Sequence, residues 1–302
     1  MSTLYTEQSN NTRKTWLLMS VFLIVVIAIG FLFAQVFNNP NILYVFVAFS
    51  IVMNITGYWF SDKIALSIAG AKPATREEYF DLYNIVQNLS ITAGLPMPKI
   101  YVIPDNAPNA FATGRDKNHA VVAVTTGLLA IMNKVELEGV IAHELSHIGN
   151  RDMLVSTVAV VLVGFISIVS DMFIRTTMWG GRNNDDREGS PLVMVVGIVL
   201  SILAPIAATL LQLAISRKRE YLADTSGALL TRYPQGLASA LTKLRDYSTP
   251  MQRQSTAIAH LYISNPFGEG SSFGKSASWR IGNLFSTHPP LEDRIKVLME
   301  NK

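Results

Sequence analysis

The chain contains no cysteine, and this absence limits both its covalent and its metal chemistry. Without cysteine there are no disulfide bonds and no thiolate ligands, so histidine and carboxylate side chains must hold any transition metal. Charge is also scarce: charged residues make up 16% of the 302 residues, whereas hydrophobic residues make up 49%, an excess for a soluble protein. The formal net charge of +3 is too small to indicate binding to nucleic acid, and no nucleic-acid partner is expected.

The apolar excess lies in four stretches that could cross a bilayer. Residues 16–37 and 191–216 carry no charged side chain and exceed the roughly 20 apolar residues that a span needs. Residues 42–60 are interrupted by polar side chains only. Residues 154–170 form a shorter stretch, for which a buried core helix is the alternative. We therefore predict four transmembrane helices, and the lipid bilayer is an expected partner.

The basic residues predict how the two resulting hairpins, residues 16–60 and 154–216, are oriented. Such residues lie beside the ends of the first, second and fourth stretches: Arg13, Lys14, Lys63, Lys72, Arg76, Arg217, Lys218 and Arg219. Because lysine and arginine near span ends are retained in the cytoplasm, three segments are expected there. They are an N-terminal tail (residues 1–15) and the two soluble segments, residues 61–153 and 217–302.

The first soluble segment is expected to combine amphipathic helices with short strands, and the second to contain helices. Helices are expected at residues 74–95, 128–132 and 291–299 and from residue 134 onward, and strands at residues 98–103 and 119–125. The predicted fold class is therefore a membrane α+β protein with a soluble domain that is mostly helical and contains a small β-sheet.

The most informative motif is His143-Glu144-Leu145-Ser146-His147, in the helix expected from residue 134. Residues four apart share a face of a helix, so both imidazoles can bind one metal ion. Glu144 would lie beside the open coordination position, where it can take a proton from water. The alternative is a helix with two surface histidines, but the flanking Val140-Ile141-Ala142 and Ile148 predict a partly buried face. The motif is typical of a zinc peptidase.

A catalytic zinc ion needs three protein ligands, and without cysteine the third must be histidine, glutamate or aspartate. Glu220 is the best candidate, because it lies on a helix directly after the fourth apolar stretch, with Asp224 four residues later. Asp224 could accept the second N–H of a ligand histidine and so hold its tautomer. An ordinary solvated helix face has the same spacing and stays open as the alternative.

The motifs as a set resemble the HtpX family of bacterial membrane zinc peptidases, which is related to the CAAX prenyl endopeptidases. The set also includes Asn109-Ala110-Phe111 and His288-Pro289-Pro290 followed by Arg294, so the resemblance covers nearly the whole chain. It implies a gluzincin-type endopeptidase with one Zn²⁺ per chain. It also implies a multi-pass protein of the bacterial inner membrane that removes misfolded membrane proteins, with its catalytic domain facing the cytoplasm.

The resemblance further implies roles for residues outside the motif helix. Asn109, Ala110 and Phe111 would lie beside the substrate backbone, although as bare sequence they are only a loop. His288, helped by Arg294, would hydrogen-bond the oxyanion of the tetrahedral intermediate. Alternatively, His288 caps the helix that follows it or merely packs.

Two more segments have expected roles. The strand at residues 119–125, with His119 and Val121, could be the sheet edge that aligns an extended peptide by strand addition. A plain core strand is the alternative, and His119 would then be structural or exposed. Residues 265–278 are rich in glycine and serine and are expected to form a mobile loop.

The chemistry expected of this site is hydrolysis of peptide bonds in membrane-protein substrates, because both halves of the site adjoin predicted spans. His143, His147 and Glu220 would hold Zn²⁺, and Glu144 would act as the general base. Two alternatives from other classes stay open. One is a membrane scaffold or holdase with a structural zinc site, and the other is a transport-type helical bundle with a metal-sensing domain.

Overall fold

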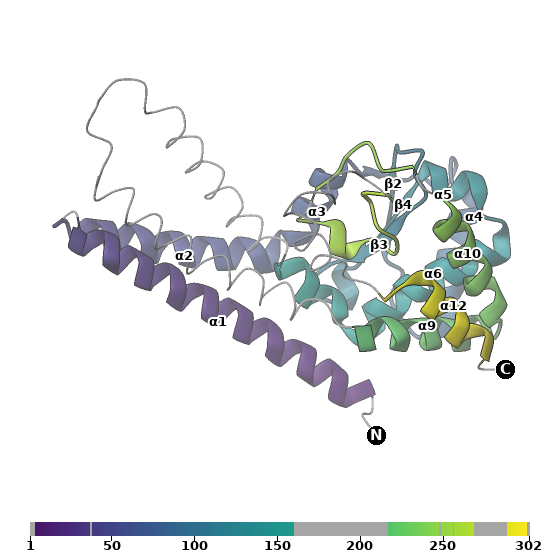
Figure 1. Ribbon diagram of the computed structural model, residues 1–302, viewed down its shortest axis with the longest axis horizontal. Coiled ribbons are helices and arrows are strands. Elements are labelled where there is room, and N and C mark those ends of the chain that lie inside the picture. Colours follow the sequence, from purple (N-terminus) through teal and green to yellow (C-terminus); the bar gives the residue numbers. More distant parts are fainter. Residues whose placement is uncertain are drawn as a thin grey trace.

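Two long helices, α1 (Leu4–Val36) and α2 (Asn41–Trp59), pack on each other and extend away from an α+β domain (Figure 1). The structure is a computed structural model, and it describes residues 4–36, 38–159, 217–247, 249–255, 257–268 and 289–300. In this part of the chain, α1 and α2 are the two helices long and apolar enough to cross a membrane. They correspond to the first two predicted spans. The predicted hairpin at residues 154–216 lies outside the described residues from residue 160 onward.

Helix α1 is longer than the predicted span. It begins at Leu4, so residues 4–15 of the predicted N-terminal tail are helical and continuous with the first predicted span. The physical reason is that no glycine or proline occurs between Leu4 and Gly30 to interrupt the helix. Towards the other end, Pro40 stands at the N-cap position of α2, which leaves a short link between the two helices.

The soluble domain contains a four-stranded mixed sheet. Its strands are β1 (Lys72–Pro73), β2 (Lys99–Ile103), β3 (Ala110–Thr113) and β4 (Val121–Thr125), and their spatial order is β1-β2-β4-β3. β4 is parallel to β2 and antiparallel to β3, whereas β1 is antiparallel to β2. The predicted strands at residues 98–103 and 119–125 are therefore present, but the second one begins at Val121 and is interior.

The prediction that residues 119–125 form a sheet edge is wrong. Both sides of β4 are occupied by neighbouring strands, and its side chains are buried on both faces. Val122 and Val124 point to one hydrophobic cluster, and Val121 and Ala123 point to the other. A strand buried on both faces has a nearly continuous apolar sequence, and the run alone does not distinguish interior from edge. β3, which includes Ala110 and Phe111, lies at the end of the sheet instead.

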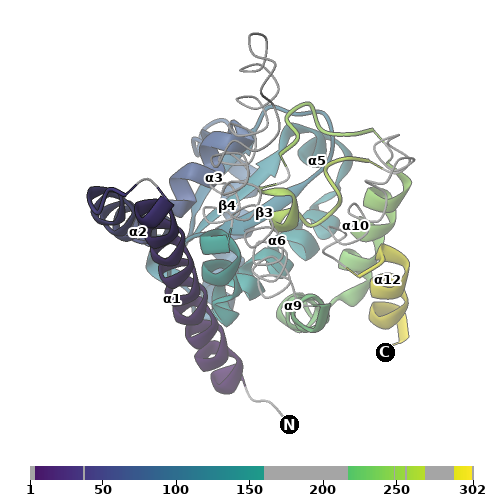
Figure 2. The same ribbon diagram turned by 60° about the vertical axis from the view of Figure 1, so that its left-hand side comes forward.

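Helices pack on the sheet and place the metal-binding motif. They are α3 (Ser61–Ala69), α4 (Phe80–Ala93), α5 (Thr126–Ile131), α6 (Lys134–Asn150), α9 (Arg217–Thr231), α10 (Pro234–Asp246) and α12 (Leu291–Glu300), with short 3₁₀ turns η1 (Lys117–His119) and η2 (Ala259–Leu261). α6 lies between the sheet and α9 and also contacts α4 and α10 (Figure 2). The helices expected from residue 134 and at residues 291–299 are confirmed. α4 begins later than residue 74, because Lys72 and Pro73 pair with β2 and the Ala74 N–H donates to Ile100.

Candidate metal centre

Helix α6 presents His143 and His147 on one face. The helix starts at a capping box, in which Asn133 and Glu136 each accept a hydrogen bond from the other's backbone N–H, both at 2.9 Å. The two imidazole rings lie edge to face with centroids 4.7 Å apart, and their Nε2 atoms are 3.2 Å apart. The four-residue spacing therefore brings two ligand nitrogens to one point, as the sequence predicts.

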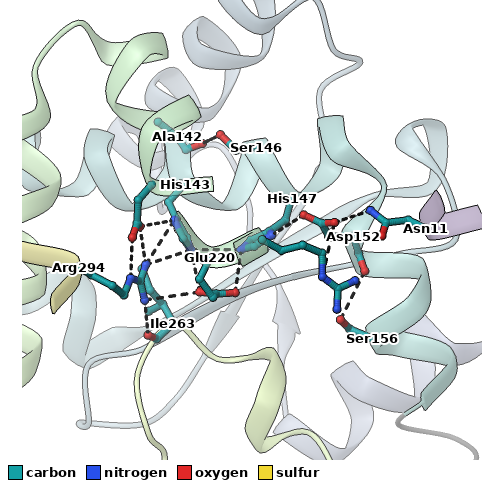
Figure 3. Close-up of polar contacts among 12 residues, drawn as sticks. Asn11, Ala142, His143, Ser146, His147, Asp152, Ser156, Glu220, Ile263 and Arg294 are labelled. Carbon is teal, nitrogen blue, oxygen red and sulfur yellow. Dashed lines mark hydrogen bonds and ion pairs between the residues drawn. The ribbon is translucent and has the colours of Figure 1, made fainter. Parts of the chain in front are cut away.

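Helix α9 contributes a carboxylate to the same point. Glu220 Oε2 lies 3.8 Å from His143 Nε2, and Glu220 Oε1 lies 3.6 Å from His147 Nε2 (Figure 3). Candidate ligand atoms of the three residues all lie within 4.8 Å of one another. Donors of a tetrahedral zinc site, at about 2.0–2.1 Å from the ion, lie about 3.3 Å apart. The three side chains thus fit a single small cation with little movement.

Each histidine has a carboxylate behind it. Asp224 Oδ1 lies 3.0 Å from His143 Nδ1, and Asp152 Oδ2 lies 3.2 Å from His147 Nδ1. Carboxylates that accept from Nδ1 leave Nε2 for the metal and hold each ring in place. The contact of Asp224 with a ligand histidine is the arrangement that the sequence predicts. Asp152 was missed, because it follows the end of α6.

The position of Asp152 depends on how α6 ends. Arg151 adopts a left-handed conformation (φ 57°), and its N–H donates to the carbonyls of His147 and Ile148. The chain then enters a new helix at residues 152–159. This change of direction brings Asp152 back towards His147. Left-handed backbone is uncommon for a residue other than glycine, and here it serves the ligand geometry.

Arg294 is buried against the carboxylates of Asp224 and Glu220. Its side chain is fully buried, and it donates to Asp224 twice, from Nε to Oδ2 at 2.8 Å and from Nη2 to Oδ1 at 2.6 Å. Its Nη1 atom lies 3.6 Å from Glu220 Oε2. A buried guanidinium must be paired, and this one is paired with carboxylates, so its predicted help to His288 in binding the oxyanion stays a prediction. His288 lies outside the described residues.

Glu144 is buried beside the two histidines. Its carboxylate accepts a hydrogen bond from the backbone N–H of Ala112 on β3. Burial raises the pKa of Glu144 to about 7, and the negative charge of Glu220 acts in the same direction, whereas the charges of His147 and Arg294 lower it. A carboxyl group with a pKa near neutrality can both accept and return a proton, which is what a general base requires.

The pKa values of the two histidines are shifted in opposite directions. Burial lowers the pKa of His143 to about 4, so its imidazole is neutral and able to bind a metal. Burial also lowers the pKa of His147, but the hydrogen bond to Asp152 and the charge of Glu220 outweigh it and raise the pKa to about 9. Binding of a cation at Nε2 must displace that proton. Burial raises the pKa of Asp224, but the adjacent Arg294 outweighs this and holds it at about 2.

Three of the predicted substrate-binding residues, Asn109, Ala110 and Phe111, have buried side chains. The Asn109 side chain donates to the Ser264 carbonyl (3.0 Å) and accepts from the N–H groups of Ser264 and Ala110. Phe111 is completely buried and packs edge to face on Tyr262, with centroids 5.1 Å apart. Because the side chains of Asn109, Ala110 and Phe111 are buried, a substrate could meet this segment only through its backbone.

His119 and Val121 lie away from the metal-binding residues. His119 is half exposed, its Nδ1 lies 2.8 Å from Asp116 Oδ1, and it lines a cavity of about 350 Å³ with Trp59. Val121 lines the same cavity, and none of the metal-binding residues does. The structure therefore does not bring the predicted residues His119 and Val121 into the site.

Taken together, the fold and the site define a membrane metallopeptidase, in which helix α6 with its H-E-x-x-H motif and a glutamate from α9 form the metal site. Comparison with known proteins specifies the family. Residues 77–302 match the model for Peptidase family M48, and the chain belongs to that family.

Several relatives are similar over nearly their whole length. A protein called "Protease HtpX homolog" from Caldanaerobacter subterraneus subsp. tengcongensis is 46% identical over 302 residues, which cover 98% of this chain and 97% of that protein. One of the same name from Thermoanaerobacter pseudethanolicus is 47% identical over 301 residues, with the same coverage. The resemblance to the HtpX family is therefore confirmed.

A solved structure supports the fold. The crystal structure of S. mikatae Ste24p matches with a TM-score of 0.51 at 20% identity, covering 94% of this chain and 66% of that one. At this level of identity the likeness shows the shared fold alone.

Proposed function

We propose that this membrane metallopeptidase uses zinc to hydrolyse peptide bonds of misfolded or damaged membrane proteins at the cytoplasmic face of the bacterial inner membrane. The observation that carries the proposal is the convergence of His143, His147 and Glu220 beside the buried Glu144. A general base next to a three-ligand cation site is the minimal apparatus for metal-assisted hydrolysis.

The choice of zinc rests on the donor set. Two imidazoles and one carboxylate favour a transition metal such as zinc over magnesium or calcium, which prefer oxygen ligands. The distances of 3.2, 3.6 and 3.8 Å among the donor atoms suit a tetrahedral ion with a fourth position left for water or substrate. When bound there, Zn²⁺ would acidify water and polarise the scissile carbonyl.

The remaining steps belong to residues of the chain. Glu144 takes the proton from the attacking water and delivers it to the nitrogen of the leaving amine. Asp224 and Asp152 keep the two imidazoles oriented, and Arg294 neutralises the carboxylates behind them. The side chains of His147 and Glu220 retain 16% and 10% of their exposure, so water can reach the site from that side.

The edge of the sheet is the proposed place for the substrate backbone. β3 lies at the end of the sheet in the described residues, and the N–H of Ala112 already reaches the general base Glu144. The Ala110 carbonyl on this edge already accepts from the Ile263 N–H, so an added peptide would pair beyond Ala110, next to the metal-binding residues. β3 would then have the aligning role predicted for residues 119–125.

Membrane proteins are the proposed substrates because the site adjoins the membrane helices. The helix that follows α6, residues 152–159, packs directly against α1 through apolar side chains. The named relatives are proteases, which agrees with proteolytic turnover rather than a scaffold role. The basic residues after α2, including Lys63, support a cytoplasmic position for the domain.

The decisive experiment is degradation of an unfolded model protein, such as casein, by the detergent-purified, zinc-loaded chain with Glu144→Gln alongside. We expect cleavage by the parent and none by the variant at equal zinc content, because the variant keeps the ligands and loses the base. A variant that has lost its zinc would show that the assignment of ligand and base is wrong. A parent that binds zinc but cleaves nothing would favour the scaffold or holdase alternative.

A further inference from the structure

A buried polar contact connects the first membrane helix with the metal centre. Asn11, in the third turn of α1, is 1% exposed. Its side-chain Nδ2 donates to Asp152 Oδ1 at 2.6 Å and to the Asn150 carbonyl at 3.1 Å. These partners are about 140 residues away in the sequence, so the contact exists only in the folded chain.

Asp152 connects Asn11 to the candidate metal ligand His147. One of its oxygens accepts from Asn11, while the other lies 3.2 Å from His147 Nδ1. Figure 3 shows the line of side chains from Asn11 on α1 through Asp152 to His147, with Glu220 on the far side of the imidazole. One carboxylate therefore joins a membrane helix to a metal-binding histidine.

The contact is anchored on both sides. The Asn150 carbonyl belongs to the last turn of α6, where helix carbonyls have no partner within the helix, and Asn11 supplies one. Further along α1, Leu18 and Phe22 pack on Val155 and Val158 of the following helix. Burying an amide and a carboxylate is costly unless both are hydrogen-bonded. Removal of the Asn11 side chain would take one hydrogen-bond donor away from the buried carboxylate of Asp152.

We propose that Asn11 is a positioning residue of the metal centre, which holds Asp152 so that His147 presents Nε2 to the metal. The first membrane helix is then a structural part of the active site, although the match to the peptidase family begins only at residue 77. Metal affinity depends on how α1 docks on the domain. The inference rests on the proposed function only in requiring that His143, His147 and Glu220 bind zinc.

The test measures zinc affinity of the full-length, detergent-purified protein by competition with a chromogenic chelator. Asn11→Ala should weaken zinc binding about tenfold, at the lower end of the effect of removing groups behind a metal ligand. Asn11→Leu, which keeps the bulk of the side chain and removes its donors, should do the same. Circular dichroism and thermal melting establish that both variants are folded.

Thr15→Val is the matched control. Thr15 lies one turn further along α1, is 2% exposed, and its hydroxyl donates to the Asn11 carbonyl within the same helix. Its substitution disturbs the same buried interface but leaves the Asn11–Asp152 contact in place. Zinc affinity of Thr15→Val should equal that of the parent.

A double-mutant cycle separates positioning from general loosening of the interface. Asp152→Ala alone should weaken zinc binding by about 10–100-fold, and adding Asn11→Ala should then change it less than about twofold. Equal effects of Asn11→Ala with and without Asp152 would overturn the proposal. So would parental affinity in both folded Asn11 variants, or an equal loss in Thr15→Val.

Failure of the proposed proteolytic function and failure of the proposed role of Asn11 give different results. Zinc affinity is read without any substrate, so a parent that binds zinc and cleaves no protein would refute proteolysis and leave this inference intact. A parent that cleaves casein while the Asn11 variants keep its zinc affinity would refute only the role of Asn11.

Discussion

At the scale of residues, the site is a set of buried charges that hold one another. His143 is backed by Asp224, and Asp224 is held by Arg294, which is completely buried. His147 is backed by Asp152, which Asn11 holds in turn. A buried charge is tolerated only when it is paired and hydrogen-bonded, so removal of one member leaves the next with fewer partners. Asp152 also lies 3.9 Å from Arg219 Nε.

Arg294→Met is expected to lower the free energy of unfolding by about 3–5 kcal/mol, because it leaves Asp224 and Glu220 buried without their cation. Thermal or denaturant unfolding in detergent would measure the loss. Arg245→Met is the control, since Arg245 is 2.8 Å from the exposed Asp246, and surface ion pairs contribute about 0–1 kcal/mol. Similar losses in the two variants would show that burial of Arg294 does not govern its contribution.

At the scale of elements, the site depends on the contact between α6 and α9. Glu220, Asp224 and Gly227 follow one another at helical spacing on α9 and face α6. A Cβ atom at Gly227 would lie 2.9 Å from the backbone nitrogen of His143, which is closer than Cβ atoms approach other atoms in proteins. Only glycine allows α9 to approach closely enough for Glu220 to reach the histidines.

Gly227→Ala should therefore push α9 away from α6, lower stability by about 1–3 kcal/mol and weaken zinc binding. Melting temperature and chelator competition would measure the two effects. Gly149→Ala on α6 is the matched control, because its Cβ would meet only Leu95 Cδ1, at 3.9 Å. That variant should keep the parental zinc affinity. Parental affinity in Gly227→Ala as well would show that the close approach is not needed.

Glu136, in the first turn of α6, should make the stability of the fold depend on pH. Burial raises the pKa of Glu136, but hydrogen bonds from Lys243, the Asn133 N–H and Ser239 outweigh it and hold the pKa below its ordinary value of 4.5. The folded state therefore binds the proton less tightly than the unfolded state. The stabilisation is fully present above pH 4.5 and is lost as the pH falls through the folded pKa.

Glu136→Gln should accordingly be less stable than the parent at neutral pH, and the difference in melting temperature should shrink as the pH falls below 4.5. Melting curves over this pH range would measure it. Glu138→Gln on the same helix controls for the change in net charge. A difference that stays constant with pH would contradict the assignment of this effect to Glu136.

At the scale of the whole molecule, the metal site and the membrane helices form one structure. α1 contacts the domain through Asn11 and through apolar side chains that meet residues 154–159. The domain also follows α2 directly, because α3 begins two residues after α2 ends. The orientation of the helices in the bilayer therefore determines which side of the membrane the site can serve.

The absence of cysteine allows a direct test of orientation. Asn39 lies in the link between α1 and α2, and Glu77 lies on the exposed surface of the domain. A membrane-impermeant maleimide should label the Asn39→Cys variant in intact spheroplasts, and the Glu77→Cys variant only after the spheroplast membrane is opened. The opposite pattern would place the domain outside the cytoplasm and refute the proposed orientation.

Local features of the chain were predictable from the sequence. The helix with His143 and His147, the two N-terminal spans and the strand at residues 98–103 follow from periodicity and apolar length, which involve near neighbours only. Glu220 was found because it follows a predicted span and matches a family motif. The predicted roles of the site residues beyond this geometry stay predictions.

Features that depend on contacts between distant segments required the tertiary structure. The sequence by itself determined the class of protein and the three candidate ligands, because helical spacing and residue chemistry are local properties. Only the tertiary structure decided that residues 121–125 are interior, that Arg294 lies behind the ligands, and that Asp152 and Asn11 support His147. The physical reason is that strand order and buried hydrogen bonds join residues up to about 140 positions apart, and no local pattern records which of them meet.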